Sequence, residues 1–340
     1  MSIELLTSSY DYTLPPELIA TKPLYPRDSS KLLVYDRAND TITHTSFKYI
    51  MDYIPDDCDI FLNDTKVIKA RIYGKKPSGG KWEFLLNKPL DNNKYLVMIR
   101  GRVKKGTIVY FDNNLSAKVL TLNDDGSREV IFEQNDKILI FEELISILDD
   151  IGHIPLPPYI QREDNDSDKE DYQTLFASNS GAVAAPTASL HFTKELFQEF
   201  SSKYNIHKIT LHVGSGTFKP VEVDNILAHP MHSEYYNIPY STQKILDTKR
   251  KVLAIGTTVT RTIEYYARGN SSSGECDLFL NPHNKPIKVD YLLTNFHLPK
   301  STLIMLVSSF IGREKSLELY QEAIKNRYRF YSYGDAMMII

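Results

Sequence analysis

Cysteine is scarce in this sequence, and long uninterrupted apolar runs are missing. The two cysteines, Cys58 and Cys276, are too few for a disulfide framework or a four-thiolate zinc site, which suits a reducing compartment. The most apolar segment, 303–311, is interrupted by two serines and is far too short to span a bilayer. The N-terminus has no basic region followed by an apolar stretch, so it does not resemble a signal peptide. These absences predict a cytoplasmic protein that does not associate with membranes.

The composition is that of a globular protein. Its 340 residues are 42% hydrophobic and 24% charged, which excludes a largely disordered chain. The length is enough for two ordinary domains, or for one large domain that carries an insertion.

The charges are segregated along the chain. Residues 66–110 hold twelve Lys and Arg against two acidic residues, a net charge of +10, whereas the rest of the chain carries −13. A basic segment on an acidic body is typical of a module that binds a polyanion. Lysines on a solvated β surface that prevent edge strands from pairing would give the same pattern. Charge alone leaves both interpretations open.

The segment 67–133 has the pattern of an all-β module. Trp82, Phe84 and Leu86 alternate with the residues between them, which is the period of two of a strand. Turn-forming Gly, Asn, Asp and Pro separate six short runs, and this spacing predicts a small barrel or sandwich. The six predicted strands are 67–73, 81–86, 95–100, 107–111, 116–121 and 128–132.

Outside this segment, strands and helices alternate, which predicts a mixed α/β fold built on a barrel-like sheet. We expect buried strands near 208–213, 252–255 and 289–294, a helix at 139–149, and another that Thr193 caps. The chain is therefore predicted to form one discontinuous α/β domain, 1–66 and 134–340, with a basic β-barrel domain, 67–133, inserted. The acidic stretch 163–171 is predicted to be a flexible, solvated loop.

Polar clusters follow three of the predicted strands, where α/β folds bind their ligands. His212 precedes Gly214-Ser215-Gly216-Thr217, whose glycines let backbone approach a ligand closely, although an ordinary tight turn would look the same. Thr257 and Thr258 begin a helix on which Arg261 and Glu264 follow; these charges would hold an anion or simply pair with each other. The third cluster is 295–302, with an imidazole, an ammonium and two hydroxyls.

Histidines gather at 229–234, where His229, His232 and Glu234 could join His191 and His212 around a metal ion. Pro230 breaks the helical register that such a pair needs, and the spacing matches no common zinc motif. We therefore expect no metal here and favour acid/base chemistry.

Several of these clusters resemble the S-adenosylmethionine:tRNA ribosyltransferase-isomerases, a family of queuosine biosynthesis. The matching blocks include Gly152-His153-Ile154-Pro155-Leu156-Pro157-Pro158-Tyr159-Ile160 and Asn295-Phe296-His297-Leu298-Pro299-Lys300-Ser301-Thr302. The others are 10–15 with 26–28, 62–67 with 70–71, 184–193, 211–218, 231–236, 256–258 and 328–336.

The resemblance implies that S-adenosylmethionine is a substrate that donates its ribosyl carbons, while adenine and methionine leave. The acceptor would be the 7-aminomethyl group of a 7-deazaguanine at the wobble position of tRNA. A base must remove a proton beside the sulfonium, with His212 or His191 as candidates, and an acid must protonate adenine, with Glu234 or His232 as candidates. Methionine would be held by Arg261 or the 256–258 turn, together with Glu264 or Asp335. The candidate residues for binding S-adenosylmethionine are Asn63, Asp64, Thr65, Gly214, Gly216, Thr217, Thr257, Thr258, Arg261, Glu264, Asn295, His297 and Asp335.

The resemblance implies that the basic β module binds the anticodon stem-loop of tRNA. Exposed bases would stack on Trp82, Tyr73 or Tyr110, and the wobble base would be extracted into a pocket between the two domains. We expect a monomer. The residues predicted to contact tRNA are Arg71, Lys75, Lys76, Arg100, Arg102, Lys104 and Lys105.

Two other functions remain as alternatives. One is a tRNA methyltransferase that uses the same sulfonium substrate, although the Gly-rich strand–turn–helix signature of most such enzymes is missing. The other is a non-catalytic RNA-binding protein, which would leave the polar clusters beyond three strand ends without a role.

Overall fold

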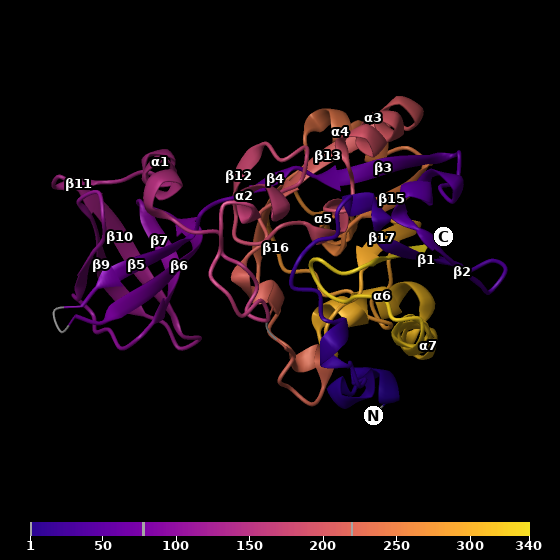
Figure 1. Ribbon diagram of the computed structural model, residues 1–340, viewed down its shortest axis with the longest axis horizontal. Helices are drawn as coiled ribbons and strands as arrows, with labels where there is room; N and C mark the ends of the chain where they lie inside the picture. Colours follow the sequence, from indigo (N-terminus) through magenta and orange to yellow (C-terminus); the bar gives the residue numbers. More distant parts are fainter. Residues whose placement is uncertain (1, 77–78, 219) are drawn as a thin grey trace.

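The computed structural model describes residues 2–76, 79–218 and 220–340. These residues form two bodies joined side by side, a small β-barrel and a larger α/β body (Figure 1). The predicted class, a mixed α/β fold that carries an inserted small barrel, is confirmed.

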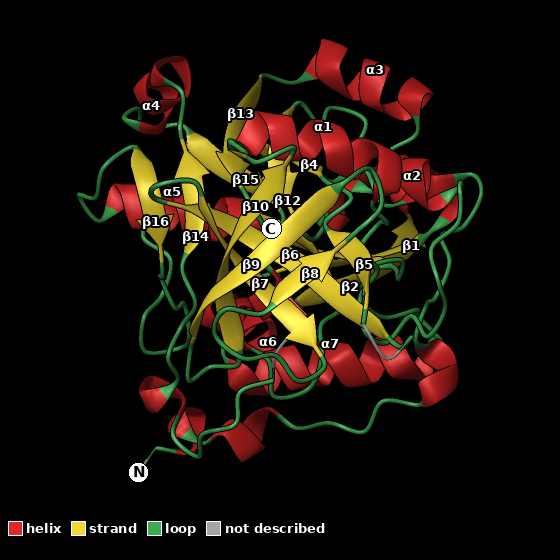
Figure 2. Ribbon diagram, turned by 90° about the vertical axis from the view of Figure 1, so that its left-hand side faces the viewer, coloured by secondary structure: helices red, strands yellow, loops and turns green. Residues whose placement is uncertain are grey.

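Six antiparallel strands close the barrel in the order β10-β7-β6-β5-β8-β9, with β9 and β10 pairing to complete the ring. The short strand β11 (Lys137–Ile138) extends β10 outside this ring. Figure 2 views the molecule from the barrel side, with β6 to β9 crossing in front of the larger body. The six strands are β5 (Arg71–Lys75), β6 (Lys81–Leu90), β7 (Lys94–Arg100), β8 (Ile108–Tyr110), β9 (Leu115–Leu122) and β10 (Ser127–Gln134).

The first predicted barrel strand, 67–73, is wrong as one element. Its beginning lies in β4 (Thr65–Val67), which pairs in parallel with β12 (Asn179–Ala182) in the larger body. Its end lies in β5, so the chain crosses from one body to the other at residues 68–70. The sequence showed only a run of β-forming residues, and the pairing partners that divide it lie far along the chain.

Helix α1 (Phe141–Ile151) packs on the barrel, as Figure 1 also shows. Its buried Leu144 and Leu148 belong to the same hydrophobic core as Phe84 and Phe132 of the barrel strands. The core of the barrel therefore extends to the helix that follows the last barrel strands.

The larger body is built on a nine-stranded mixed sheet with the order β16-β14-β13-β3-β15-β17-β18-β1-β2. Four adjacent strands of this sheet, β13, β3, β15 and β17, run parallel to one another. Their carboxyl ends therefore lie at the same edge of the sheet. The strands are β1 (Lys31–Asp36), β2 (Thr41–Ser46), β3 (Cys58–Asn63), β13 (Ile206–Leu211), β14 (Glu234–Asn237), β15 (Lys251–Ile255), β16 (Ser273–Cys276), β17 (Tyr291–Asn295) and β18 (Ala336–Ile339).

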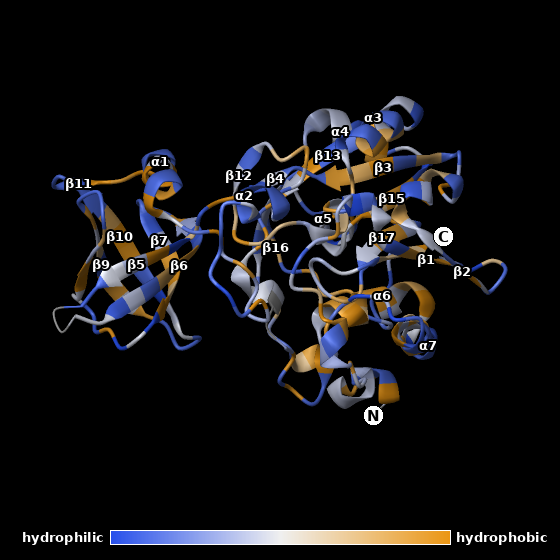
Figure 3. Ribbon diagram, viewed as in Figure 1, coloured by the Kyte–Doolittle hydropathy of each residue, from blue (hydrophilic) through white to orange (hydrophobic). Residues whose placement is uncertain are grey.

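Both faces of this sheet are covered, which explains why its central strands are nearly continuous apolar runs. In β3, Ile60 and Leu62 join the core on one face, whereas Phe61 joins the core on the other. Figure 3 shows the middle of β3 as continuously hydrophobic, in contrast to the alternating strands of the barrel. Helix α3 (Lys194–Lys203) covers the first face, and α4 (Tyr240–Leu246), α5 (Thr257–Ala267), α6 (Thr302–Ile311) and α7 (Arg313–Lys325) cover the second. Thr193 caps α3 as predicted, because its hydroxyl accepts a hydrogen bond from the Leu196 amide.

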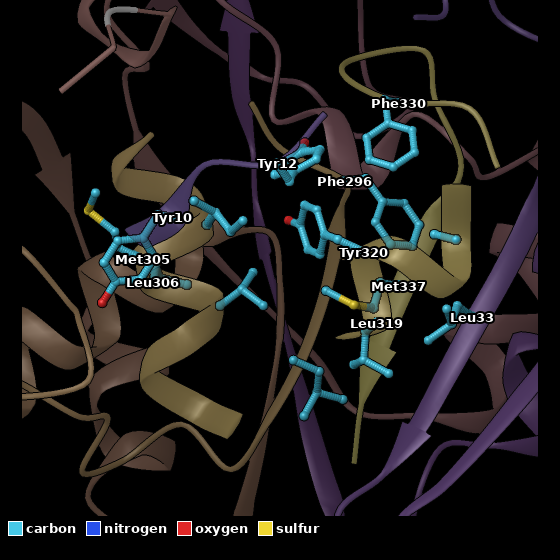
Figure 4. Close-up of a cluster of buried hydrophobic side chains, with 14 of the residues drawn as sticks. Tyr10, Tyr12, Leu33, Phe296, Met305, Leu306, Leu319, Tyr320, Phe330 and Met337 are labelled. Atoms are coloured by element: carbon cyan, nitrogen blue, oxygen red, sulfur yellow. The ribbon is translucent and has the colours of Figure 1, made fainter. Parts of the chain in front are cut away.

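An aromatic cluster lies beneath the loop that follows β17 (Figure 4). Phe296 of that loop packs edge-on against Tyr320, with ring centroids 5.3 Å apart. The hydroxyl of Tyr12 donates a hydrogen bond to the His297 carbonyl, and the His297 amide donates to the Tyr320 hydroxyl at 3.1 Å. The buried core thus fixes the backbone of a loop that carries predicted site residues.

The acidic stretch 163–171 is mostly exposed, as predicted, but two buried carboxylates anchor it. Asp168 is fully buried at the start of the short helix α2 (Asp168–Asp171), and Arg162 holds it with two hydrogen bonds of 2.6 and 2.7 Å. Asp171 is also buried, 3.4 Å from Arg27. Each buried carboxylate has a basic partner: Arg162 is close to Asp168 in the sequence, whereas Arg27 lies far from Asp171 in the chain.

Candidate active site

The principal cavity lies at the carboxyl edge of the parallel strands. It encloses about 690 Å³ between atoms, part of it open to solvent. Its lining is mainly apolar, with a small number of hydroxyl, amide and imidazole groups, which is the composition of a small-molecule site. The lining residues are Tyr159, Ala184, Ala185, Pro186, Thr187, Ala188, Val213, Thr217, Gly256, Thr257, Thr258, Thr294, Asn295, Phe296, His297, Leu298, Ser301, Leu303, Tyr331 and Ser332.

The cavity brings together residues from all three predicted clusters. Thr217 follows β13, Thr257 and Thr258 follow β15, and Asn295 and His297 come from the end of β17 and the loop beyond it. They meet because these strands run in parallel and their ends share one edge. The sequence indicated the three clusters but not the wall opposite them.

The β15 corner presents a helix N-terminus to the cavity. Gly256 has φ 104°, a conformation that favours glycine, and α5 begins immediately after it. The first turn of the helix therefore exposes backbone amides and the hydroxyls of Thr257 and Thr258 at the positive end of its dipole. Such a corner can bind ribose hydroxyls or a negatively charged group.

A chain of hydrogen bonds runs through one wall of the cavity. The Thr187 hydroxyl donates to Asn295 Oδ1 at 3.1 Å, and Asn295 Nδ2 lies 3.2 Å from His191 Nε2. The His191 ring is stacked on Phe47, and burial, then the charges of Arg329 and Arg27, lowers its pKa to about 3. His191 is therefore neutral, and its Nε2 lone pair is already engaged, which disfavours it as the base.

Two aromatic rings form the opposite wall. Tyr159 and Tyr331 lie with ring centroids 4.6 Å apart, and the Tyr159 hydroxyl accepts a hydrogen bond from the Ser332 amide at 2.9 Å. Tyr331 has φ 74°, a strained conformation for a bulky side chain, and such residues concentrate at functional sites. Neither tyrosine was among our candidate residues, although both lie in blocks that carry the family resemblance.

His212 lies at the end of β13, immediately before the cavity residue Val213. Its Nδ1 is 2.8 Å from the Thr65 hydroxyl, and its ring stacks on Tyr235 at a centroid distance of 5.8 Å. Burial lowers the pKa of His212, so the neutral imidazole that a base requires is favoured. The ring packs closely on Gly181, where an added Cβ would lie 2.7 Å from Nε2, and His212 itself is not among the residues that line the cavity.

Glu234 does not fit the predicted role of proton donor. It is buried, with Arg261 Nη1 at 2.6 Å and the Gly214 amide at 2.9 Å from its two oxygens. Burial alone would raise its pKa, but the charge of Arg261, with smaller contributions from His232 and the Gly214 amide, lowers it to about 2. The carboxylate therefore stays ionised at neutral pH and has no proton to donate.

Arg261 and Glu264 are also unsuited to the predicted binding of methionine. The Arg261 guanidinium is buried and donates to Glu234 and to the carbonyls of Leu278 and Cys276. Glu264 is fully buried; it accepts hydrogen bonds from the amides of residues 287–289 and pairs with Arg268. The sequence placed both charges on one helix but could not show that the fold uses them internally.

Asp335 is another structural group rather than a ligand contact. It accepts hydrogen bonds from the amides of Lys31 and Arg329 at 3.1 and 2.7 Å, and it is outside the lining of the principal cavity. Burial raises its pKa. It joins β1 to the segment before β18.

The predicted group 63–65 braces the edge of the sheet behind the cavity. The Asn63 side chain accepts a hydrogen bond from the Leu211 amide and donates one to the Leu211 carbonyl. Asp64 accepts a hydrogen bond from the Thr210 hydroxyl at 2.7 Å. Thr65 orients His212. These residues therefore contact the cavity walls rather than the cavity itself.

Gly214 and Gly216 shape the loop beyond His212. A side chain on Gly216 would begin 2.7 Å from the ring of His232, so only glycine lets this loop and His232 approach so closely. The His232 Nε2 lies 3.7 Å from Glu234 Oε1. A barrel residue holds Ser215 in place: Asn87 Oδ1 accepts hydrogen bonds from both the amide and the hydroxyl of Ser215 at 3.1 Å.

Most of the predicted basic contacts on the barrel face solvent. Lys75, Arg100, Arg102, Lys104 and Lys105 are exposed. Lys76 is half-buried, with its ammonium 5.6 Å from the centre of the Trp82 ring.

Two residues of the predicted RNA surface, Arg71 and Trp82, are not available to RNA. Arg71 pairs with Glu83 at 3.2 Å and donates to the Leu156 carbonyl, so it joins the barrel to the larger body. Trp82 is only 8% exposed and belongs to the barrel core. Tyr110 is 65% exposed and is the best placed of the three aromatic candidates, because Tyr73 is half-buried.

Across residues 2–76, 79–218 and 220–340, no group of three or more His, Cys, Asp or Glu is arranged to hold a metal ion. In the same described ranges, no helix is both long and apolar enough to cross a bilayer.

Comparison with known proteins identifies close relatives. A family model described as queuosine biosynthesis protein matches residues 7–339. The S-adenosylmethionine:tRNA ribosyltransferase-isomerase of Aliarcobacter butzleri is 65% identical over 336 residues, 99% of both chains. The protein of that name from Campylobacter jejuni is 60% identical over 343 residues, 100% of both chains. A crystal structure of S-adenosylmethionine tRNA ribosyltransferase from Thermotoga maritima matches 98% of this chain and 100% of its own, with 34% identity and a TM-score of 0.55.

Proposed function

This chain belongs to the queuosine biosynthesis family of S-adenosylmethionine:tRNA ribosyltransferase-isomerases, and from that premise we propose which of its residues perform each step. The enzyme transfers the ribosyl carbons of S-adenosylmethionine to the 7-aminomethyl group of 7-deazaguanine in tRNA and isomerises them. Epoxyqueuosine in tRNA, methionine and adenine are the products.

The cavity at the carboxyl edge of β13, β15 and β17 is the observation that carries the proposal. Its lining of apolar side chains with a few hydroxyl, amide and imidazole groups is typical of small-molecule sites and suits a nucleoside. The aromatic wall of Tyr159 and Tyr331 offers a surface for adenine, and the hydroxyls of Thr257 and Thr258 face the ribose.

His212 is the proposed base. The sulfonium acidifies the adjacent 5′ methylene, so a neutral imidazole is strong enough to accept the proton. Burial supplies the neutral form of His212, Thr65 orients its ring, and the next residue, Val213, lines the cavity.

His232 is the proposed acid that protonates adenine as the glycosidic bond breaks. Its ring packs against Gly216 of the loop that also carries the cavity residue Thr217. The ionised Glu234 at 3.7 Å would stabilise the protonated imidazole. One proton is thus removed from carbon and one is delivered to adenine.

The barrel is the proposed site for the anticodon stem-loop, with 67–133 and helix α1 as a tRNA-binding module on the catalytic body. Lys75, Lys76, Arg100, Arg102 and the pair Lys104–Lys105 would contact phosphates, and Tyr110 would stack on an unpaired base. The wobble base would then enter between the two bodies.

Product analysis tests this function directly. The protein is incubated with S-adenosylmethionine and tRNA that bears the aminomethyl base, and the small molecules are identified by mass spectrometry. Adenine and methionine in equal amounts are expected. S-adenosylhomocysteine would indicate a methyltransferase, and no turnover would leave a protein that only binds RNA.

A further inference from the structure

A second cavity lies beside the first, in a region where we predicted no ligand contact other than His191. It encloses about 230 Å³, and Ser332 lines both cavities. The hydrogen bond of 3.2 Å between Asn295 and His191 joins a residue of the first lining to one of the second. The second cavity is lined by Pro23, Leu24, Arg27, Ser30, Leu190, His191, Arg329, Ser332, Tyr333 and Gly334.

The charge of this lining is positive. It contains two guanidinium groups, Arg27 and Arg329, and no acidic side chain among the described residues that form it. Asp171 and Asp335, the carboxylates nearest to these arginines, lie outside the lining, at 3.4 and 3.6 Å from Arg27 and Arg329 respectively. The influence of both arginines extends across the cavity, because their charges contribute to the lowered pKa of His191.

Both arginines retain capacity for a ligand. Arg27 donates from Nη1 to the Gln173 carbonyl and from Nη2 to the Glu170 carbonyl and Asp171 Oδ1, and its side chain is 14% exposed. Arg329 donates from Nη1 to the Lys22 carbonyl, and its buried Nε lies 3.6 Å from Asp335 Oδ1. Each guanidinium therefore has a carboxylate beside it, and both guanidiniums line the cavity.

Ser30 adds a neutral donor. Its hydroxyl oxygen lies 2.9 Å from His191 Nδ1. With Asn295 donating to Nε2, the proton of the neutral ring is on Nδ1, so Ser30 accepts that bond and its own hydrogen is free to donate into the cavity.

We propose that this second cavity binds the methionine carboxylate of S-adenosylmethionine, between Arg27 and Arg329. The inference rests on the proposed function, in which the nucleoside occupies the first cavity. It offers an anion contact at two guanidiniums that line a cavity, whereas Arg261 lines neither cavity and binds Glu234 and two carbonyls. The substrate would thus span both cavities across Ser332.

Two ligands separate the contribution of each cavity. S-adenosylmethionine carries the carboxylate, whereas 5′-methylthioadenosine carries the same nucleoside without the amino-acid group. Binding of both to the wild-type protein and to Arg329→Met is measured by titration calorimetry. We expect the variant to bind S-adenosylmethionine about 10–100-fold more weakly, the effect of losing a charge-assisted hydrogen bond, and methylthioadenosine with unchanged affinity.

Three further variants keep the test independent of folding. Arg327→Met, an exposed arginine two residues away, is the matched control and should leave both affinities unchanged. Arg329→Lys should recover part of the lost affinity, and Arg27→Met should repeat the selective loss. Thermal unfolding verifies that each variant is folded.

The possible failures are distinguishable. If the wild-type protein bound neither nucleoside, the proposed function of the first cavity would be wrong. If the Arg329 and Arg27 variants bound both ligands normally, or lost both equally, the carboxylate subsite alone would be refuted. A loss of tRNA affinity with normal S-adenosylmethionine binding would assign the arginines to a tRNA phosphate and would also overturn the proposal.

Discussion

Asn87 of the barrel strand β6 accepts two hydrogen bonds from Ser215 of the larger body, one from its amide and one from its hydroxyl, each 3.1 Å long. Ser215 belongs to the loop that carries Thr217 into the principal cavity. A side chain of the proposed tRNA-binding module therefore fixes a loop of the site where the chemistry is proposed to occur.

Removing this contact should impair catalysis without unfolding the enzyme. We expect Asn87→Ala to raise KM for S-adenosylmethionine about tenfold, because two hydrogen bonds of about 1 kcal/mol each no longer hold the loop. Asn87→Asp keeps the accepting oxygen and should stay close to the wild type. Steady-state kinetics at saturating tRNA measures the difference, and equal KM values for Asn87→Ala and wild type would show that the loop needs no anchor.

Replacing the proposed base should affect kcat rather than substrate binding. We expect His212→Gln to lower kcat by about 10²–10⁴, the usual contribution of a general base. Because burial lowers the pKa of His212, the wild-type rate should remain high below pH 6.5 and fall only as pH drops through that lowered pKa. The matched control is His207→Gln, on the same strand, where the imidazole lies 3.6 Å from Asp59. Single-turnover rates measured across pH distinguish the two variants. If His212→Gln had a normal kcat, His212 would not be the base.

Neutralising Glu234 should destabilise the protein at neutral pH and much less in acid. The Glu234→Gln variant leaves Arg261 buried without its counter-ion, which costs about 3–5 kcal/mol. The folded pKa of about 2 is below the unfolded value of about 4.5, so the wild-type advantage is complete above 4.5 and is lost as pH falls toward 2. Urea unfolding at pH 7 and at pH 3 measures the difference in unfolding free energy between the wild type and the variant. A difference that does not change with pH would show that the charge is unimportant.

His297 should contribute to acid sensitivity. Burial lowers its pKa to about 3, whereas the unfolded chain takes up a proton near 6.5. Folding stability should therefore fall by about 1.4 kcal/mol per pH unit for this group as pH drops from 6.5 toward 3. His297→Gln should remove that part of the slope, although it is less stable at pH 7 because the bond to Thr294 is altered. Denaturation at four pH values in this window provides the test, and identical slopes would contradict it.

Reversing charge at the barrel tip should weaken tRNA binding. Lys104 and Lys105 are both exposed, and the double variant to Glu should reduce affinity at low salt and flatten the salt dependence by about two counter-ions. Lys194→Glu with Lys325→Glu makes the same charge change on helices α3 and α7 of the catalytic body. Filter binding from 50 to 300 mM salt compares the two. If the barrel variant bound tRNA as the wild type does, these lysines would lie outside the interface.

The barrel illustrates how much of the fold is readable along the chain. Five of its six strands follow the sequence-based ranges closely, because each is a local run of alternating residues bounded by turn-forming ones. The segment 67–73 was misread, since the same residues satisfy strand propensity whether they pair with β12 or with β6.

The site shows a different limit. The sequence indicated Thr217, Thr257, Thr258, Asn295 and His297, all of which line the cavity, because each follows a recognisable strand. It could not exclude Arg261 and Glu264, whose partners are backbone groups and a distant carboxylate. Nor did it select Tyr159 or Tyr331, which come from irregular segments and reach the cavity only through the fold.

Local order along the chain thus determined the fold class, the charged barrel and the family. Periodicity, turn chemistry and motif order are properties of neighbouring residues, so they can be read without coordinates. The tertiary structure decided which charges are free to meet a substrate and which neutralise one another inside the protein. That choice depends on burial and on partners many residues away, as the pairing of Glu234 with Arg261 shows.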